Sequence, residues 1–440
     1  MPITMKAGFA KIDVTPAYSV PLGGYGNTHE RMHTTVLDPI YAICVAVSDG
    51  ESKALIYNLD QVGFDEVLVE ECKSALFALH GIPGENILFN ASHTHSAPDL
   101  TSPLECIATY RKELVEKVIA VAAPALADLE DCRIFIGSGR VEGLTFVRRY
   151  LLSDGTYGGD NFGDFVNNTI LGHESSVDDE MQVVRFEREG KKDILLVNWQ
   201  GHPHRTGGAT TPNLSSDLVE YFRLGVEGEH GVLMAFIQGC GGNINHNSRV
   251  KEEMRASTHI EVGKALAEGI RPILAGMREV RGGKIRATVE TFTGEVNHAW
   301  DDKVPVAEEI VAFRETHTRK ETTAFAVSKG FNSVYHASAV IRKSKMPKTD
   351  SYLIGALAFG DVCIAWTPNE LYDTTGKYIK ATSPFEMTFA CGYTNGRAGY
   401  MPTIKAYAHG GYGCDTCRFP AGTTEKLTNC ILEQILKVKE

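Results

Sequence analysis

Eight short apolar runs constrain the fold of this chain more than any other feature of its sequence. Runs such as "YAICVAV" (41–47) and "GVLMAFI" (231–237) are apolar at consecutive positions. A strand of that kind is buried on both faces, as in parallel or mixed sheets that helices cover. The predicted strands span 41–47, 54–59, 86–91, 181–187, 193–199, 231–237, 352–359 and 362–367.

Longer stretches with helical periodicity alternate with these strands, so the sequence predicts an α/β protein with mixed β-sheets covered by helices. A chain of 440 residues is long enough for two or three domains. Because no low-complexity linker or long charge run divides it, we predict a single domain over residues 1–440. The predicted helices span 64–80, 106–128, 216–228, 250–276, 305–317, 369–382 and 424–438.

The charge balance limits the partners of the protein. The formal net charge is −11, so the sequence offers no basic face to nucleic acid or to an acidic lipid surface. No apolar run approaches the ~18 residues of a membrane span. The opening "MPITMKAGFAKIDVTP" also lacks the apolar core of a signal peptide. We therefore expect a cytoplasmic protein without a membrane partner, whose ten cysteines are mostly buried thiols.

A loose recurrence runs through the chain. Three times a strand, a tight glycine turn and a second strand are followed by polar residues, as in "MQVVRFEREGKKDILLVNWQGHPH". In each of these three segments, side chains that can bind a metal follow just beyond a strand end. Loops in that position commonly carry function. The recurrence predicts one shared site, although the three segments differ too much in sequence to establish a duplication. The residues delivered are His93 and His95, His202 and His204, and Glu370.

The stretch "NASHTHSAPD" (90–99) points to metal chemistry. Residues two apart on a strand face the same way, so His93 and His95 can approach one centre, or one can bind metal while the other contacts substrate. A lone His-x-His pair is more often two polar loop residues. The second motif, Gly201-His-Pro-His204, shifts the balance toward a metal, because two histidines and a glutamate form a catalytic zinc set.

These motifs resemble the neutral/alkaline ceramidase family of zinc amidases. "ASHTHSAPD" is similar to that family's "GTHTHSGP", and "TNGRAGYMPT" (394–403) is similar to its "NGYIGYLPT". Further similarities, from "AGFAKIDVTP" (7–16) to "FPAGTTEKL" (419–427), follow in family order along nearly the whole chain. The resemblance implies the fold of the family's N-terminal catalytic domain, without its C-terminal immunoglobulin-like domain.

The resemblance also implies a zinc site. Its ligands would be His93, His202, Glu370 and a tyrosine of the 393–400 segment. We favour Tyr400, because the alternative family position holds Arg397, which cannot bind zinc. Glu370 also reads as an early acidic residue of a helix that follows Pro368, and both readings are compatible.

Catalysis would then use His95 as a proton donor or as a hydrogen-bond donor to the developing oxyanion, with Tyr400 in a similar role. Alternatively, His95 only orients a metal ligand and takes no direct part in the reaction. Asn245, in "QGCGGNIN" (238–245), stands where the ceramidases carry a serine once proposed as nucleophile. An acyl-serine route through that position is therefore excluded, and we expect Asn245 and its glycine-rich neighbours to line the substrate pocket.

Three arginines are candidate substrate-binding residues. Arg148 and Arg149 could clamp a carboxylate, but neighbouring strand residues face opposite ways, so at most one faces the site. Arg397 favours an anionic substrate, and a salt bridge to Asp415 is the alternative. Within "LSSD" (214–217), Ser215 or Ser216 is expected to cap a helix.

The sequence thus predicts a zinc-dependent hydrolase that cleaves an amide bond of a small polar N-acyl compound by water attack, without a serine nucleophile. Lactone or ester hydrolysis, or sugar-acid chemistry, on the same scaffold is the alternative, and a non-catalytic metal-binding protein is the third possibility. The expected cofactor is Zn²⁺ and the expected partner is a small molecule. The sequence leaves open a homo-oligomer and a second metal near His95 and His204.

Overall fold

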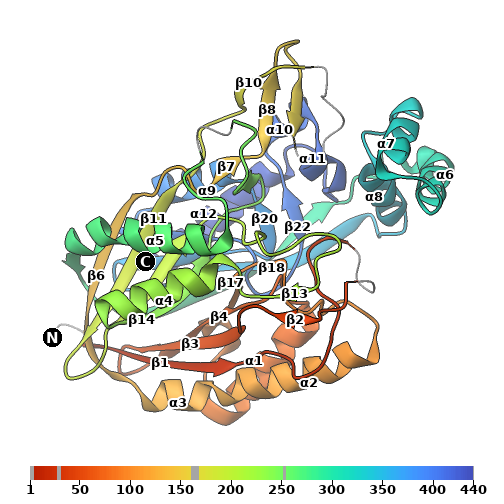
Figure 1. Ribbon diagram of the computed structural model, residues 1–440. Helices are drawn as coiled ribbons and strands as arrows, with labels where there is room; N and C mark the ends of the chain where they lie inside the picture. The colour runs from red at the N-terminus through yellow and green to blue at the C-terminus, as the bar shows by residue number, and fades with distance from the viewer. Residues whose placement is uncertain (1–3, 27–30, 160–167, 251–253, 440) are drawn as a thin grey trace.

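The computed structural model describes residues 4–26, 31–159, 168–250 and 254–439, and at its centre two β-sheets pack face to face (Figure 1). The larger has nine strands, in the order β14-β12-β11-β6-β1-β3-β4-β5 with β16 beside β6, and the smaller follows the order β17-β18-β19-β21. Both contain parallel and antiparallel pairs, which confirms the predicted α/β class with mixed sheets. The strands are β1 (Met5–Asp13), β3 (Tyr41–Ser48), β4 (Lys53–Leu59), β5 (Ile87–Ala91), β6 (Glu130–Arg140), β11 (Glu180–Arg188), β12 (Ile194–Trp199), β14 (Leu233–Gln238), β16 (Arg278–Val280), β17 (Ile285–Glu295), β18 (Thr349–Phe359), β19 (Val362–Trp366) and β21 (Met387–Cys391).

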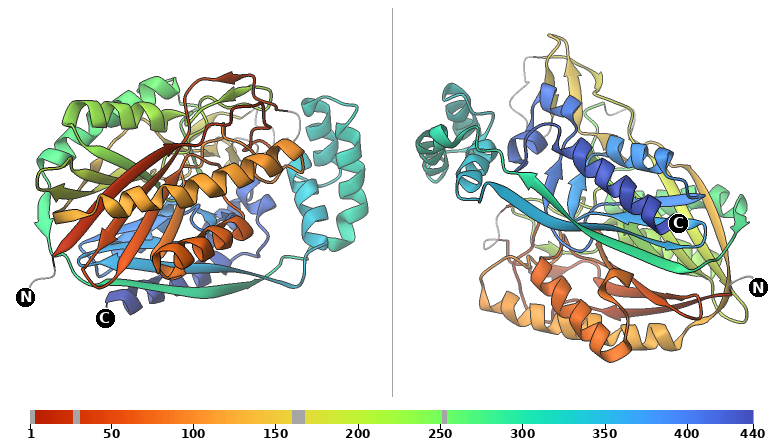
Figure 2. Two further views of the ribbon diagram at one scale, coloured as in Figure 1. Left: turned by 90° about the horizontal axis from the view of Figure 1, so that it is seen from below. Right: turned by 180° about the vertical axis from the view of Figure 1, so that it is seen from behind.

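Helices cover the outer face of each sheet (Figure 2). Between the sheets, Val45, Val184 and Phe359 belong to one buried apolar cluster. Strands that lie between this cluster and the helices are buried on both sides, which explains their unbroken apolar pattern. The covering helices are α1 (Glu66–His80), α2 (Glu105–Ala120), α3 (Ala122–Ala127), α4 (Leu218–His230), α5 (His259–Ala275), α9 (Asp373–Thr382) and α12 (Thr423–Lys439).

The recurrence in the sequence corresponds to a structural module that occurs three times. In each module three antiparallel strands are followed by a helix and a fourth strand that runs parallel to the third. The carboxyl ends of the third and fourth strands therefore lie at the same edge of the sheet. The modules are β1-β3-β4-α1-β5, β6-β11-β12-α4-β14 and β17-β18-β19-α9-β21.

The hairpin between the second and third strand of each module turns at a glycine. The φ values are 91° at Gly50, 73° at Gly190 and 69° at Gly360. These values lie in the left-handed region, which residues with a Cβ rarely adopt. The tight glycine turn expected in each recurrence is thus confirmed, because each of these turns connects an antiparallel strand pair.

Several predicted boundaries are wrong, for local reasons. Residues 369–371 form a strand, β20 (Asn369–Leu371), which pairs in parallel with β22 (Gly399–Met401), and the helix starts only at Asp373. The cap of α4 is Asp217, whose carboxylate accepts from the Leu218 N–H at 2.8 Å, rather than a serine. The helix predicted from 250 begins at His259, after a capping box of Thr258 and Glu261, and positions 251–253 lie outside the described residues.

A helical insertion separates β17 from β18. It contains α6 (Val304–Arg314), α7 (Arg319–Ser328) and α8 (Val334–Ser344), which have a small apolar core of their own and stand at the side of the molecule (teal in Figure 1). The insertion contacts the main body through α11 (Tyr412–Thr416), where Asn332 Nδ2 donates to both carboxylate oxygens of Asp415 at 2.9 and 3.0 Å.

Two expectations about the chain as a whole concern membranes and thiols. Within the described ranges, no helix combines the length and the apolar character that a membrane crossing requires. All ten cysteines are free, and Cys414 and Cys417 of the C-x-x-C motif are both buried. Most of the cysteines are buried, as predicted.

Candidate metal centre

The three predicted histidine and glutamate segments converge at the carboxyl ends of the parallel strand pairs. His93 and His95 follow β5, His202 follows β12, and Glu370 lies on β20 directly after β19. Each module therefore contributes at least one side chain to the same place. The three segments therefore lie together in space, and their function as one site stays a prediction.

At the centre of the site, three imidazole nitrogens meet. His95 Nε2 lies 2.8 Å from His202 Nε2 and 3.2 Å from His93 Nε2. Zinc–nitrogen bonds of about 2.05 Å at tetrahedral angles place two ligand nitrogens about 3.3 Å apart. The spacing of the nitrogens is thus close to that of a shared metal ion.

Hydrogen bonds to the other ring nitrogens orient these rings. His93 Nδ1 lies 2.6 Å from the Val62 carbonyl, so Nδ1 carries the proton and Nε2 presents a lone pair. His202 Nδ1 faces the Gly241 carbonyl at 3.4 Å in the same sense. His95 Nδ1 has no hydrogen-bond partner among the described residues, so nothing fixes the tautomer of His95 in this way. The lone pairs of His93 Nε2 and His202 Nε2 both face His95 Nε2, and either a proton on that nitrogen or a shared cation satisfies them, so the arrangement is compatible with a metal site.

Burial keeps the rings neutral. His93 and His202 are 3% and 2% exposed. Burial lowers the pKa of His93 to about 3, and it lowers the pKa of His202 well below its usual value. Neutral imidazole is the form that binds metals, so the site is prepared for an ion without loss of a proton from these rings.

Glu370 supplies the carboxylate. Its Oε2 lies 3.6 Å from His93 Nε2 and has no hydrogen-bond partner among the described residues, although the atom is buried. Burial raises the pKa of Glu370, while the nearby charges of Arg397 and Arg148 oppose that shift. A buried carboxylate oxygen without a partner is costly, and a cation beside it removes the cost.

Tyr400 lies beside this carboxylate. The register of β20 and β22 places Glu370 directly opposite Tyr400, and the Tyr400 hydroxyl acts against the rise in the pKa of Glu370. That Tyr400 is a metal ligand, as the resemblance implied, stays a prediction. Tyr393 of the 393–400 segment lies on the other side of the histidines, with its ring centroid 4.0 Å from that of His93.

The donor set fits a divalent ion such as zinc. His93, His95 and His202 are the single group of three ligand-type side chains within 4.8 Å of one another that the described part of the chain contains. His204 belongs to no such group, so the second metal that the sequence left open has no three-residue site among these residues.

His95 approaches the same centre as His93, which is one of the two arrangements that the sequence allowed, because its Nε2 lies between those of His93 and His202. Its role as a proton or hydrogen-bond donor stays a prediction. The main chain of Gly24 packs so closely on this ring that a Cβ there would lie 2.5 Å from His95 Cγ. Arg31, which is 2% exposed, donates to the His95 carbonyl at 2.6 Å. His95 is therefore held firmly from outside the cluster.

Of the neighbouring pair of arginines, one faces the site. Arg148 donates to the Gly242 carbonyl at 2.8 Å and lies 5.5 Å above the Tyr400 ring. Arg149 points away, toward Glu174, with an Nε to Oε2 distance of 2.5 Å. This alternation is what the strand geometry predicted for adjacent residues.

Arg397 is not buried as expected, whereas the expected role of Asn245 is not tested by its position. The Arg397 side chain is exposed, so no buried-charge cost demands an anionic partner, and Asp415 is engaged with Asn332 instead. Asn245 is buried, and its side-chain oxygen accepts from the Asn247 N–H at 3.1 Å. Contact of either residue with a substrate remains a prediction.

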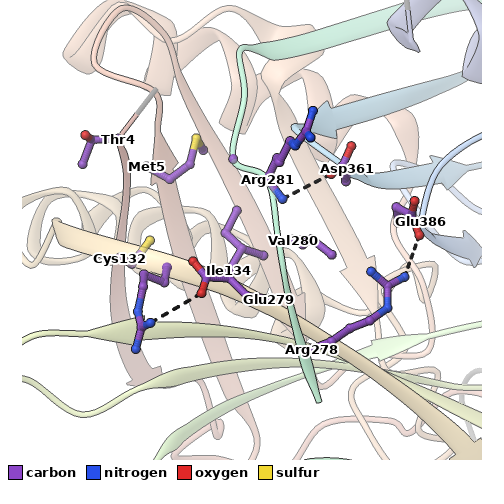
Figure 3. Close-up of a pocket in the computed structure, with 12 residues that line it drawn as sticks. Thr4, Met5, Cys132, Ile134, Arg278, Glu279, Val280, Arg281, Asp361 and Glu386 are labelled. Atoms are coloured by element: carbon purple, nitrogen blue, oxygen red, sulfur yellow. Dashed lines mark hydrogen bonds and ion pairs between the residues drawn. The ribbon is translucent and has the colours of Figure 1, made fainter. Parts of the chain in front are cut away.

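A separate cleft of about 980 Å³ opens at the other end of the strands (Figure 3). Asp361, in its wall, precedes β19, whereas Glu370 follows that strand. Two of its arginines are paired, Arg278 with Glu386 at 2.6 Å and Arg133 with Glu279 at 3.4 Å. The cleft is therefore distinct from the histidine cluster.

Two solved structures share this architecture. A neutral ceramidase from Pseudomonas aeruginosa matches over 100% of this chain and 75% of its own length, with a TM-score of 0.74 and 18% sequence identity. A ceramidase complexed with C2 matches over 99% of this chain and 75% of its own, with a TM-score of 0.75 and 16% identity. No protein-family model matches the chain, and no curated protein sequence does. The ceramidase-like fold implied by the motifs is confirmed.

Proposed function

We propose that this protein is a zinc-dependent hydrolase that cleaves an amide bond of a small polar N-acyl compound by direct attack of water. The observation that carries the proposal is the convergence of three neutral imidazoles on one another, with the buried, unpartnered Oε2 of Glu370 3.6 Å from His93 Nε2. The shared fold with two ceramidases supports amide chemistry, because it places this cluster on a scaffold known from amidases.

In this proposal, His93, His202 and Glu370 hold the ion, and His95 lies close enough to join them. Bound zinc would lower the pKa of a water molecule toward ~7 and polarise a carbonyl group. The protein supplies fixed orientation: the Val62 and Gly241 carbonyls set the His93 and His202 rings before any ligand arrives.

Arg148 and Tyr400 would stabilise the charge that develops on the substrate oxygen. The Arg148 guanidinium lies 5.5 Å from the centre of the Tyr400 ring, so its positive charge would favour an anion formed nearby. Burial raises the pKa of Tyr400 well above its usual value, so the phenol keeps its proton and remains a donor. Proton return to the leaving nitrogen falls to His95 if it is not a ligand, and otherwise to Tyr400.

Metal content and turnover together test this proposal. Protein purified without added chelator is expected to contain one zinc per chain, to lose hydrolysis of N-acyl amino acids on chelation, and to regain it with zinc. A panel of esters and lactones run beside the amides addresses the alternative reaction. Preference for lactones or esters would replace amide cleavage, and full activity in metal-free protein would refute a metal-dependent reaction.

A further inference from the structure

Tyr393 lies against His93 in a geometry that few residues adopt. The two rings are tilted by 32° with centroids 4.0 Å apart. Both residues have positive φ, 65° at His93 and 53° at Tyr393, although neither is glycine. Such conformations are costly for residues with a bulky side chain and persist where the surrounding structure fixes them, often at functional sites.

The main chain of Tyr393 connects two arms of the histidine cluster. Its carbonyl accepts from the Ala91 N–H at 3.0 Å, two residues before His93. Its N–H donates to the Asn369 carbonyl at 3.2 Å, one residue before Glu370. These bonds impose the unusual backbone at Tyr393 and thereby place its ring on the face of His93.

The Tyr393 side chain is buried without a hydrogen bond from its hydroxyl. Tyr393 is 3% exposed, and its hydroxyl has no hydrogen-bond partner among the described residues. The hydroxyl rests against the main chain at Gly241, where a Cβ would lie 3.3 Å from it. The Gly241 carbonyl faces His202 Nδ1, so one phenol touches both the His93 ring and the segment that orients His202.

We propose that Tyr393 is a positioning residue of the metal centre, which fixes the plane of the His93 ring by stacking and so sets the affinity and geometry of the bound ion. The inference rests on the proposed metal site. A phenylalanine keeps the stacked ring, whereas an aliphatic residue leaves His93 free to turn about its side-chain bonds. Loss of such an orienting contact typically weakens metal binding by roughly 10- to 100-fold.

Metal titrations of stripped protein test the proposal without reference to turnover. Zinc affinity is measured by competition with a chromophoric chelator, and the visible spectrum of the cobalt(II)-loaded protein reports the geometry of the site. We expect Tyr393→Leu to bind zinc at least 10-fold more weakly than the parent and to show a shifted cobalt spectrum. Tyr393→Phe should stay within about threefold of the parent, with an unchanged spectrum.

Tyr57→Leu is a matched control. Tyr57 is also a buried tyrosine, and its ring is tilted by 30° on Phe89 with centroids 4.7 Å apart, inside the core beneath the site. This variant should lose stability but bind zinc as the parent does. Should Tyr393→Leu fail to fold, Tyr393→Met, which removes the flat ring but keeps much of its volume, replaces it.

Three results would overturn the inference. Parental zinc affinity and cobalt spectrum in folded Tyr393→Leu or Tyr393→Met would make Tyr393 an ordinary core residue. An equal loss of affinity in Tyr57→Leu would show that general destabilisation, and not the stacking on His93, lowers the affinity. Absence of zinc binding in the parent would refute the metal centre itself, and that outcome is distinguishable from the first two because it appears before any variant is made.

Discussion

Asn90 and Gln238 exchange two hydrogen bonds across the junction of two modules. Asn90 Oδ1 accepts from the Gln238 N–H at 2.8 Å, and Asn90 Nδ2 donates to the Gln238 carbonyl at 3.2 Å. The same amide also donates to the Gly392 carbonyl at 3.2 Å and to Thr394 Oγ1 at 2.9 Å. One buried side chain at the end of β5 therefore joins the ends of β14 and β21, directly beneath the histidines.

Replacement of Asn90 by alanine should destabilise the protein and weaken its metal binding together. The change leaves the buried main-chain N–H of Gln238 without its partner, at a cost of about 1–3 kcal/mol, whereas the Gly392 carbonyl keeps its hydrogen bond from Thr394 Oγ1 at 2.7 Å. Asn86→Ala, which removes one bond to the Lys53 carbonyl, should cost about 1 kcal/mol and leave the metal site intact. Urea denaturation and zinc titration measure both effects. A stability loss no larger than that of Asn86→Ala would refute the joining role.

Removal of single histidines should separate ligands from other roles. We expect His202→Ala to lose bound zinc, because His202 presents a lone pair to the cluster. His95→Gln distinguishes two roles: loss of zinc identifies a ligand, whereas zinc at full stoichiometry with little turnover identifies a proton carrier. His336→Ala, at a buried histidine of the helical insertion, is the control and should keep its zinc. Full zinc and activity in His202→Ala would refute the proposed ligand set.

Turnover should proceed without an acyl-enzyme. By the sequence resemblance, Asn245 takes the place of a ceramidase serine, and its side-chain oxygen accepts from the Asn247 N–H. In water enriched in ¹⁸O, a single-turnover experiment should place one labelled oxygen in the product acid, with no burst of released amine. A substrate-derived acyl group on any side chain, detected by mass spectrometry of quenched protein, would contradict direct water attack.

The two arginines near the site should differ in their effects. Arg148 lies beside Tyr400, so Arg148→Ala should lower kcat/KM for N-acyl amino acids by roughly 2–5 kcal/mol in activation free energy, the range for a lost buried charge contact. Arg397 is exposed, and Arg397→Ala should cost about 1 kcal/mol or less. The kcat/KM values of both variants are measured for charged substrates and for their neutral amides. Equal losses of kcat/KM in the two variants would show that Arg397 contributes to catalysis as much as Arg148 does, although its side chain is exposed.

Lys73→Met should stabilise the protein in a pH-dependent way. Lys73 is 7% exposed, its ammonium lies 5.8 Å above the Trp366 ring, and no carboxylate of the described residues is within ion-pair distance. Burial lowers its pKa from 10.5 to about 8, so the folded state binds this proton less tightly than the unfolded chain.

The free energy of unfolding of the parent should therefore rise between about pH 8 and 10.5, because in that range the folded chain has released this proton and the unfolded chain still holds it. Lys73→Met should be more stable than the parent by about 2–3 kcal/mol at pH 7, and this difference should shrink toward pH 10.5. Denaturation at both pH values checks the sign. A difference that does not change with pH would rule out the charge of Lys73 as its cause.

The sequence predicted those elements whose burial follows directly from their order of apolar and polar residues. Strands between two covered faces read as unbroken apolar runs, and the histidines that follow them could be placed at strand ends. Strands β1, β6 and β17 were missed because solvent-facing residues interrupt them, as the alternating burial of β6 illustrates. Glu370 was assigned to a helix because "TPNE" is a good helix start, while the strand there depends on pairing with distant β22.

Residues of the site that the sequence did not reveal are those fixed by contacts far along the chain. Tyr393 owes its conformation to bonds from Ala91 and Asn369, and neither its positive φ nor its ring stacking leaves a local pattern. Arg31 reaches the His95 carbonyl through a loop crossing that no periodicity records. Burial of Arg397 was wrongly assumed for a related reason, since exposure depends on what packs over a loop.

The division of the site among three modules has a consequence for how the chain acquires it. His93 is available early in synthesis, but Glu370 and Tyr393 emerge only when most of the chain has been made. Loop closure between such distant segments is slow, so productive coordination should be among the last events of folding. Zinc uptake would then occur only when folding is nearly complete. Truncated or stalled chains, which lack Glu370, would be unable to bind the ion.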